Sequence, residues 1–229
     1  MGFNEKVHAF IAASFYTHLT ESFGERGRLA FVHATQYYAE QRGRRMAQRA
    51  IRDGKPLTYE VYCQYGEWVN TPEIIELSCA NQSERLSLAP DYMVKITTCP
   101  WHAQFAEMGL TEAGHEYCQH LDNSICRGFN PYLVYEVPQT LHKSDCCIHI
   151  VRNAGLSEQS DTKKKMEYTK PFEYHCAHSY FAYSEVARAI FAAEGEQVSA
   201  KVLADFTREY GSDMADTLVS YRDTNFNVC

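Results

Sequence analysis

Reactive side chains concentrate in the 55 residues from Thr98 to Arg152. This stretch holds five of the nine cysteines and five of the ten histidines. A purely structural core would fill its interior with Leu, Ile and Val. Thiols, imidazoles and carboxylates beside tight turns are instead typical of a site that performs acid–base or nucleophilic chemistry. We therefore expect the functional site in this stretch.

Cys99 precedes Pro100 where an expected strand ends and an expected helix begins. Unpaired backbone N–H groups and the helix dipole lower the pKa of a thiol at such a helix N-terminus and favour the thiolate. His102 could assist the proton transfer. Cys99 is therefore a candidate catalytic nucleophile, and an inert buried thiol is the alternative.

Cys118 and Asp122 are four residues apart on an expected helix from Thr111 to about Ile125, so they share one helix face. Asp122 could act as a general base, anchor a substrate or cap a loop. We treat both residues as catalytic candidates.

Asn130 lies in an expected loop from Gly128 to Pro131 and must be extended before the proline. Its amide both donates and accepts hydrogen bonds, which suits a bound planar ligand and a locked turn equally. Asn130 is therefore a candidate substrate-binding residue.

His178 is expected near the start of a long C-terminal helix, where a neutral imidazole could move a proton during catalysis. The pair Cys99 and His102 and the pair His175 and His178 together outline four zinc ligands. Their spacings are permissive and the pairs are far apart in sequence. We therefore expect no metal, and we expect no cofactor.

Four arginines, at positions 42, 45, 49 and 52, recur on one face of an expected helix. They could form a solvated face with acidic partners elsewhere. Alternatively, one guanidinium could turn inward and bind a substrate carboxylate with two hydrogen bonds. Arg45 is the candidate for that substrate contact.

The elements that must position these residues predict an α+β fold. Apolar residues at helical spacing predict a helix that ends at Gly24 and a second helix from about Arg26 to Arg52. Alternation predicts a strand from Leu57 to Tyr65, and β-branched residues predict another at Tyr92–Thr98. Further helices are expected after Pro100 and Thr111.

Leu133–Val137 and Cys146–Val151 are expected to pair as strands. Helices are expected at Phe172–Glu194, Ser199–Tyr210 and Ser212–Tyr221. We therefore predict one domain over residues 1–229 with a central mixed or antiparallel sheet. Its parts are a helical segment (1–56), an α+β core (57–151) and C-terminal helices (172–222) packed around the sheet.

The composition of the chain indicates which classes of partner it can bind. The net charge is −7, and residues 1–60 are nevertheless positive, so the rest of the chain is strongly acidic and nucleic acid is not expected as the main partner. No apolar run reaches the ~20 residues of a membrane span. The N-terminus has no signal-peptide pattern, and the cysteines show no disulfide framework. We therefore expect a cytoplasmic protein with free thiols and a small-molecule substrate; a homo-oligomer stays open.

In order and type, these residues resemble the L-2-amino-thiazoline-4-carboxylic acid hydrolase family. The resemblance covers most of the chain and departs at Ser144, where family members usually have Gly. It is carried by Arg42-Gly43, Cys99-Pro100, Gly109-Leu110, Tyr117-Cys118, Asp122, Gly128-Phe129-Asn130-Pro131, Asp145, Cys147, His175 and His178.

The resemblance implies hydrolytic ring opening of a cyclic amidine, such as 2-amino-thiazoline-4-carboxylate, to an N-carbamoyl amino acid. That reaction needs water or a thiolate as nucleophile, a base, and an acid for the leaving group. By this resemblance Cys99 or Cys118, with Asp122 and His178, would supply them. Asn130 or an arginine would hold the carboxylate.

Two alternatives remain open. The middle segment also resembles small-molecule-sensing 4-vinyl-reductase-like domains, which implies ligand binding without catalysis. An isomerase or lyase acting on another small cyclic substrate is equally consistent with the residues, because fold-level likeness does not fix function.

Overall fold

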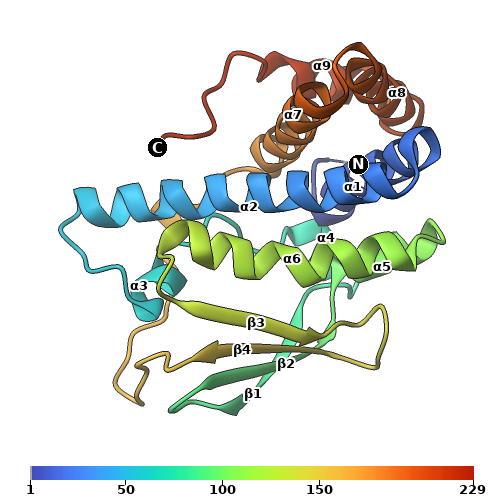
Figure 1. The fold of residues 1–229 in the computed structure, drawn as a ribbon. Coiled ribbons are helices and arrows are strands. Elements are labelled where there is room, and N and C mark those ends of the chain that lie inside the picture. The colour runs from blue at the N-terminus through green and yellow to red at the C-terminus, as the bar shows by residue number, and fades with distance from the viewer. Residues whose placement is uncertain (1) are drawn as a thin grey trace.

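The computed structural model describes residues 2–229 and has an α+β fold, as predicted. Within these residues nine α-helices accompany one four-stranded antiparallel sheet, in the order β1 (Gln82–Ser87), β2 (Tyr92–Thr98), β4 (Cys147–Arg152) and β3 (Val134–Gln139). The sheet forms one outer layer, and α6 (Thr111–Phe129) packs on its covered face (Figure 1). α2 (Glu25–Arg52) lies on α6, and α7 (Phe172–Phe191) packs against the opposite side of α2.

Two long helices open the fold, in agreement with the helical spacing of their apolar residues. α1 (Glu5–Phe23) begins at Asn4, whose side chain accepts hydrogen bonds from the backbone N–H groups of Lys6 and Val7. Gly24 has φ +57°, a conformation that glycine adopts without strain. The chain therefore turns there and starts α2 (Glu25–Arg52).

The predicted strand over Leu57–Tyr65 is wrong. This segment forms the short helix α3 (Tyr59–Gln64), and the Thr58 hydroxyl accepts a hydrogen bond from the Val61 N–H at its start. Tyr59, Tyr62 and Cys63 recur at helical spacing and pack in one apolar cluster, whereas Val61 and Tyr65 pack in the main core. The Thr58 cap was the local signal for the helix. α4 (Pro72–Glu76) follows.

The three predicted strands from Tyr92 onward are confirmed. β2 spans Tyr92–Thr98 and pairs with β4 (Cys147–Arg152), which in turn pairs with β3 (Val134–Gln139). β1 (Gln82–Ser87) was not expected, because it is a polar edge strand that is mostly exposed. Its sequence therefore lacks the alternation that marks a half-buried strand.

α5 (Pro100–Glu107) follows β2 directly, and α6 runs from Thr111 to Phe129. Gly128 and Phe129 therefore lie in the last turn of α6, and only Asn130 and Pro131 belong to the expected loop. Gly43 of α2 and Gly128 of α6 lie where the two helices meet. A Cβ on Gly43 would be 2.0 Å from the Ile125 carbonyl oxygen, so the two backbones are in direct contact.

The C-terminal part is helical, as predicted. α7 (Phe172–Phe191) ends at Ala192, α8 (Ala193–Tyr210) begins six residues earlier than expected, and α9 (Ser212–Ser220) completes the set. Between β4 and α7, the one-turn 3-10 helix η1 (Met166–Tyr168) belongs to a segment that runs beside residues 64–68.

Candidate functional site

A small cavity lies where α2, α6, β2 and β4 converge. Its volume is about 70 Å³, below the roughly 300–1,000 Å³ of a typical ligand pocket, so only a very small ligand fits. Five elements (α2, β2, α5, α6 and β4) and three residues between elements contribute its lining: Arg42, Trp68, Asn81, Ile96, Cys99, Trp101, Tyr117, Cys118, Leu121, Asp122, Cys147 and His149. Most of the cavity's reactive groups therefore come from the stretch that the sequence singled out.

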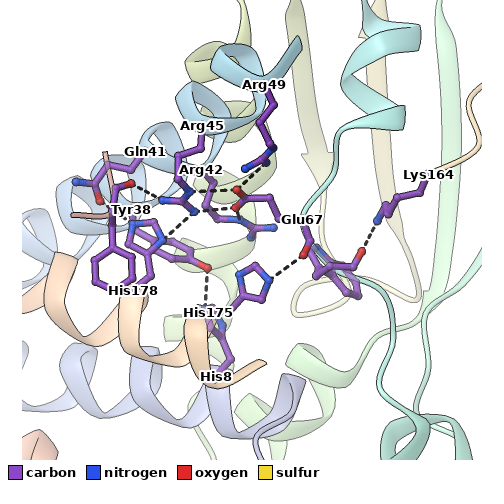
Figure 2. Close-up of polar contacts among 12 residues, drawn as sticks. His8, Tyr38, Gln41, Arg42, Arg45, Arg49, Glu67, Lys164, His175 and His178 are labelled. Carbon is purple, nitrogen blue, oxygen red and sulfur yellow. Dashed lines mark hydrogen bonds and ion pairs between the residues drawn. The ribbon is translucent and has the colours of Figure 1, made fainter. Parts of the chain in front are cut away.

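Arg42 belongs to a buried charge cluster on the α2 side of the cavity (Figure 2). Arg45 donates from Nε to Glu67 Oε1 at 3.1 Å and from Nη2 to Oε2 at 2.7 Å. Arg49 Nη2 donates to Oε1 at 2.8 Å, and Arg42 Nε lies 3.8 Å from Oε2. Burial alone would raise the pKa of the Glu67 carboxyl, but the arginines outweigh burial and hold that pKa at about 2.

Three guanidinium groups face one carboxylate here, so the cluster carries excess positive charge. Arg45 and Arg49 occupy both oxygens of Glu67. Arg42 Nε is buried without a hydrogen-bond partner, and the residue lines the cavity. A buried, incompletely paired guanidinium at a cavity wall favours an anionic ligand.

Asp122 and His149 form the second polar group of the cavity. His149 Nδ1 is 4.0 Å from Asp122 Oδ2 and 2.7 Å from the Tyr135 hydroxyl. Burial lowers the pKa of His149 and the Asp122 carboxylate partly opposes that shift, so the imidazole is neutral near pH 7. A neutral imidazole beside a carboxylate is suited to accept a proton.

Three thiols, those of Cys99, Cys118 and Cys147, also line the cavity. Burial raises the pKa of Cys99 to about 12, although the backbone N–H groups of His102 and Trp101 act in the opposite direction. The expected lowering of the Cys99 pKa by the helix N-terminus is therefore wrong, because desolvation is the larger effect. Burial also raises the pKa of Cys118 and Cys147, so all three side chains are protonated thiols near pH 7.

The structure thus brings Cys99, Cys118 and Asp122 together and places the other three candidates elsewhere. Asn130 Nδ2 donates to the Leu57 carbonyl at 2.7 Å, and its Oδ1 accepts from the Tyr132 N–H at 3.0 Å. Asn130 thereby holds the turn that follows α6. It does not line the cavity.

His178 and Arg45 are fully buried and lie next to each other, with Arg45 Nη2 3.4 Å from His178 Nδ1. His178 Nε2 is 2.7 Å from Gln41 Oε1, and its ring stacks on Phe226 with centroids 4.7 Å apart. Arg45 also donates to the Phe226 carbonyl. Neither residue lines the cavity, which therefore includes three of the six candidates, Cys99, Cys118 and Asp122.

Sequence reasoning missed Arg42 as the cavity arginine and did not select His149. A usable signal existed for His149, because strand alternation places Cys147 and His149 on the same face of β4. Trp68 gave no such signal, since it lies on a loop without regular periodicity.

Other site classes find no support in residues 2–229. No group of three or more Cys, His, Asp or Glu side chains there is arranged to hold a metal ion. In the same part of the chain, no helix combines the length and apolar character of a membrane span.

A family model described as L-2-amino-thiazoline-4-carboxylic acid hydrolase matches residues 4–150, which is more than half of the chain. The matched region includes every residue that lines the cavity. No curated protein and no solved structure matches the chain.

Proposed function

Because the chain belongs to the L-2-amino-thiazoline-4-carboxylic acid hydrolase family, we propose that it hydrolyses a small cyclic amidine that carries a carboxylate. One observation carries this proposal: a buried, incompletely paired arginine and an acid–base pair line the same small cavity. The substrate class therefore combines an anionic group with a ring carbon that water can attack.

Arg42 is the proposed anchor for the substrate carboxylate. Its guanidinium can form charge-assisted hydrogen bonds to a carboxylate, each worth about 1.5–3 kcal/mol. Arg45 and Arg49 already pair with Glu67 and do not line the cavity, so Arg42 is the member of the cluster that an incoming anion would meet.

His149 is the proposed general base, and Asp122 its stabilising partner. Neutral His149 accepts a proton from water as the water oxygen attacks the carbon between nitrogen and sulfur. The bond from that carbon to the ring sulfur breaks, and the sulfur takes up that proton. The second proton of the water moves from the new hydroxyl to the amidine nitrogen, which gives the carbamoyl group. Asp122, 4.0 Å from His149, stabilises the imidazolium formed meanwhile.

Apolar side chains supply the remaining wall, mainly Trp68, Trp101, Ile96 and Leu121. They would pack on the flat ring and leave little room for bulk water. A dry wall strengthens the electrostatic contribution of Arg42 and Asp122 to the transition state.

The test is turnover of 2-amino-thiazoline-4-carboxylate and related cyclic amidines, followed by mass spectrometry for a product heavier by one water. In the Arg42→Gln variant we expect KM to rise by about 10- to 100-fold, as for loss of a charge-assisted contact. The fold should survive, because Arg45 and Arg49 still pair Glu67.

Arg52→Gln is the matched control, since Arg52 lies on the same helix but is largely exposed. It should leave KM unchanged. Binding of these compounds without product, in correctly folded protein, would contradict the hydrolase proposal and favour a sensor.

A further inference from the structure

A second histidine, His142, lies on the connection between β3 and β4 and contacts the thiol of Cys118 on α6. His142 Nε2 lies 3.5 Å from Cys118 Sγ. Gly114 precedes Cys118 by one helical turn, and a Cβ on Gly114 would lie 2.2–2.6 Å from three atoms of the His142 ring. The imidazole therefore lies directly on the helix backbone, in space that only glycine leaves free.

The segment that carries His142 is fastened to α6 on both sides of this contact. His115 Nδ1 is 2.9 Å from the Thr140 hydroxyl, and Lys143 forms an ion pair with Glu112. These contacts hold the β3–β4 connection against the first turns of α6. The imidazole is therefore placed on the thiol by several independent interactions.

We propose that Cys118 and His142 form a nucleophile–base pair and that hydrolysis proceeds through a covalent intermediate on Cys118. In this route the Cys118 thiol, in place of the water described above, opens the ring, and the water activated by His149 acts in the second step. The inference rests on the proposed function and deepens it. Cys118 lines the cavity, whereas His142 contacts it from outside the lining, so the substrate meets the sulfur first.

The chemistry balances in two steps. Cys118 Sγ bonds to the carbon between nitrogen and sulfur, His142 Nε2 takes the thiol proton, and the bond to the ring sulfur breaks. The ring sulfur then takes that proton, so the whole substrate remains attached to Cys118 as an amidino thioether. Water activated by His149 next attacks the same carbon, releasing the carbamoyl product and the Cys118 thiol.

The surroundings of His142 explain why its proton must move on. Its Nδ1 is buried without a hydrogen-bond partner, so a lasting imidazolium would hold an unpaired buried N–H. Burial lowers the pKa of His142 to about 4 and raises that of Cys118, so the resting pair is neutral. Proton transfer therefore accompanies attack and ends on the leaving sulfur.

The first test measures Cys118 without substrate. We expect His142→Gln and Gly114→Ala to slow iodoacetamide alkylation of Cys118 by about 10-fold or more, relative to Cys99 in the same cavity. His120→Gln, a partly exposed imidazole on the same helix, is the matched control and should leave the ratio unchanged. An unchanged ratio in both test variants would overturn the pair.

The second test looks for the intermediate by intact mass after acid quenching. In His149→Gln, where the second step is slowed, we expect an adduct on Cys118 equal to the full mass of the substrate. Cys118→Ser should lower kcat by at least 100-fold and, combined with His149→Gln, should show no adduct. Cys126→Ser, on the same helix, should leave kcat unchanged and, combined with His149→Gln, should still show the adduct.

The two proposals fail differently. Turnover that persists in Cys118→Ser would overturn the covalent route and leave the hydrolase function intact. Absence of turnover of every cyclic amidine, with the alkylation effect retained, would overturn the hydrolase function and the covalent step while the nucleophile–base pair stands.

Discussion

The indole N–H of Trp101 donates to Nδ1 of His8 at 3.0 Å, and this contact fixes the protonation of a buried imidazole. An indole nitrogen only donates, so His8 carries its proton on Nε2, which lies 2.9 Å from the Tyr38 hydroxyl. Burial lowers the pKa of His8, and His175 and Arg42 lower it further. A neutral histidine thus holds one wall of the cavity.

Replacing His8 should lower the stability of the protein and change the fluorescence of Trp101. His8→Leu leaves the Trp101 N–H buried without an acceptor, which costs about 1–3 kcal/mol of the free energy of unfolding. In a Trp68→Phe background, Trp101 is the remaining tryptophan and its emission should shift. His8→Gln can accept and donate, and should restore most of the stability. Equal losses in the Leu and Gln variants would contradict this role.

The pH dependence of kcat/KM should depend on Asp122. The pKa of His149 lies below its usual 6.5, and Asp122 partly raises it. Activity should therefore fall on the acid side as His149 is protonated. Asp122→Asn removes the raising influence, so the acid limb should move to lower pH while the plateau drops. Movement toward higher pH would exclude this pairing, and exposed Asp213→Asn serves as the control.

Stability should fall in mild acid. His8, His175 and His178 are buried, and burial is the main reason that their folded pKa values lie below 6.5. Above pH 6.5 these groups are neutral in both states. Below pH 6.5 the unfolded chain binds a proton at each of these imidazoles and the folded chain does not. Each imidazole therefore lowers the free energy of unfolding by up to about 1.4 kcal/mol per pH unit.

Urea unfolding between pH 7.5 and 5 measures this loss. In His178→Gln, the slope of the free energy of unfolding against pH should be smaller by the contribution of one titrating imidazole, although the variant is less stable at neutral pH. A second loss is expected below pH 4.5, where Glu67, with a folded pKa of about 2, must also be protonated on unfolding. A flat stability curve from pH 6.5 to 5 would show that these histidines are not neutral and buried.

Gly43→Ala should separate α2 from α6. The added methyl group would lie 2.0 Å from backbone of the facing helix, which no rotamer change relieves. We expect a loss of about 3 kcal/mol in the free energy of unfolding. Gly2→Ala, where nothing lies within 4 Å, is the control and should be neutral. Neutral behaviour of Gly43→Ala would contradict the backbone contact.

The sequence predicts the helices and the covered strands because their apolar residues repeat with a clear period. It also predicts that Cys99 and Asp122 belong to one region, since one follows a strand and the other lies on the next long helix. It could not separate Arg42 from Arg45. Both occupy the same helix face, and the difference arises from Glu67, a loop residue that pairs fully with Arg45.

Two other errors have equally local causes. The segment at Tyr59–Gln64 has apolar positions that satisfy both a strand and a helix, and tertiary burial decides between them. The pKa of Cys99 depends on how far the thiol is removed from water, which no local pattern records. The sequence predicts that Cys99 lies at a helix N-terminus, but the extent of its burial follows only from the packing of the folded chain.

Glycine inside a helix costs up to about 1 kcal/mol relative to alanine, and α6 accepts some of that cost at Gly114 near its start. Selection for thermal stability alone would favour alanine there on helix propensity. The same change would push the His142 ring off the helix. Position 114 is therefore a point where stability and activity are expected to be traded against each other, and where a thermostabilised variant should be checked first for lost turnover.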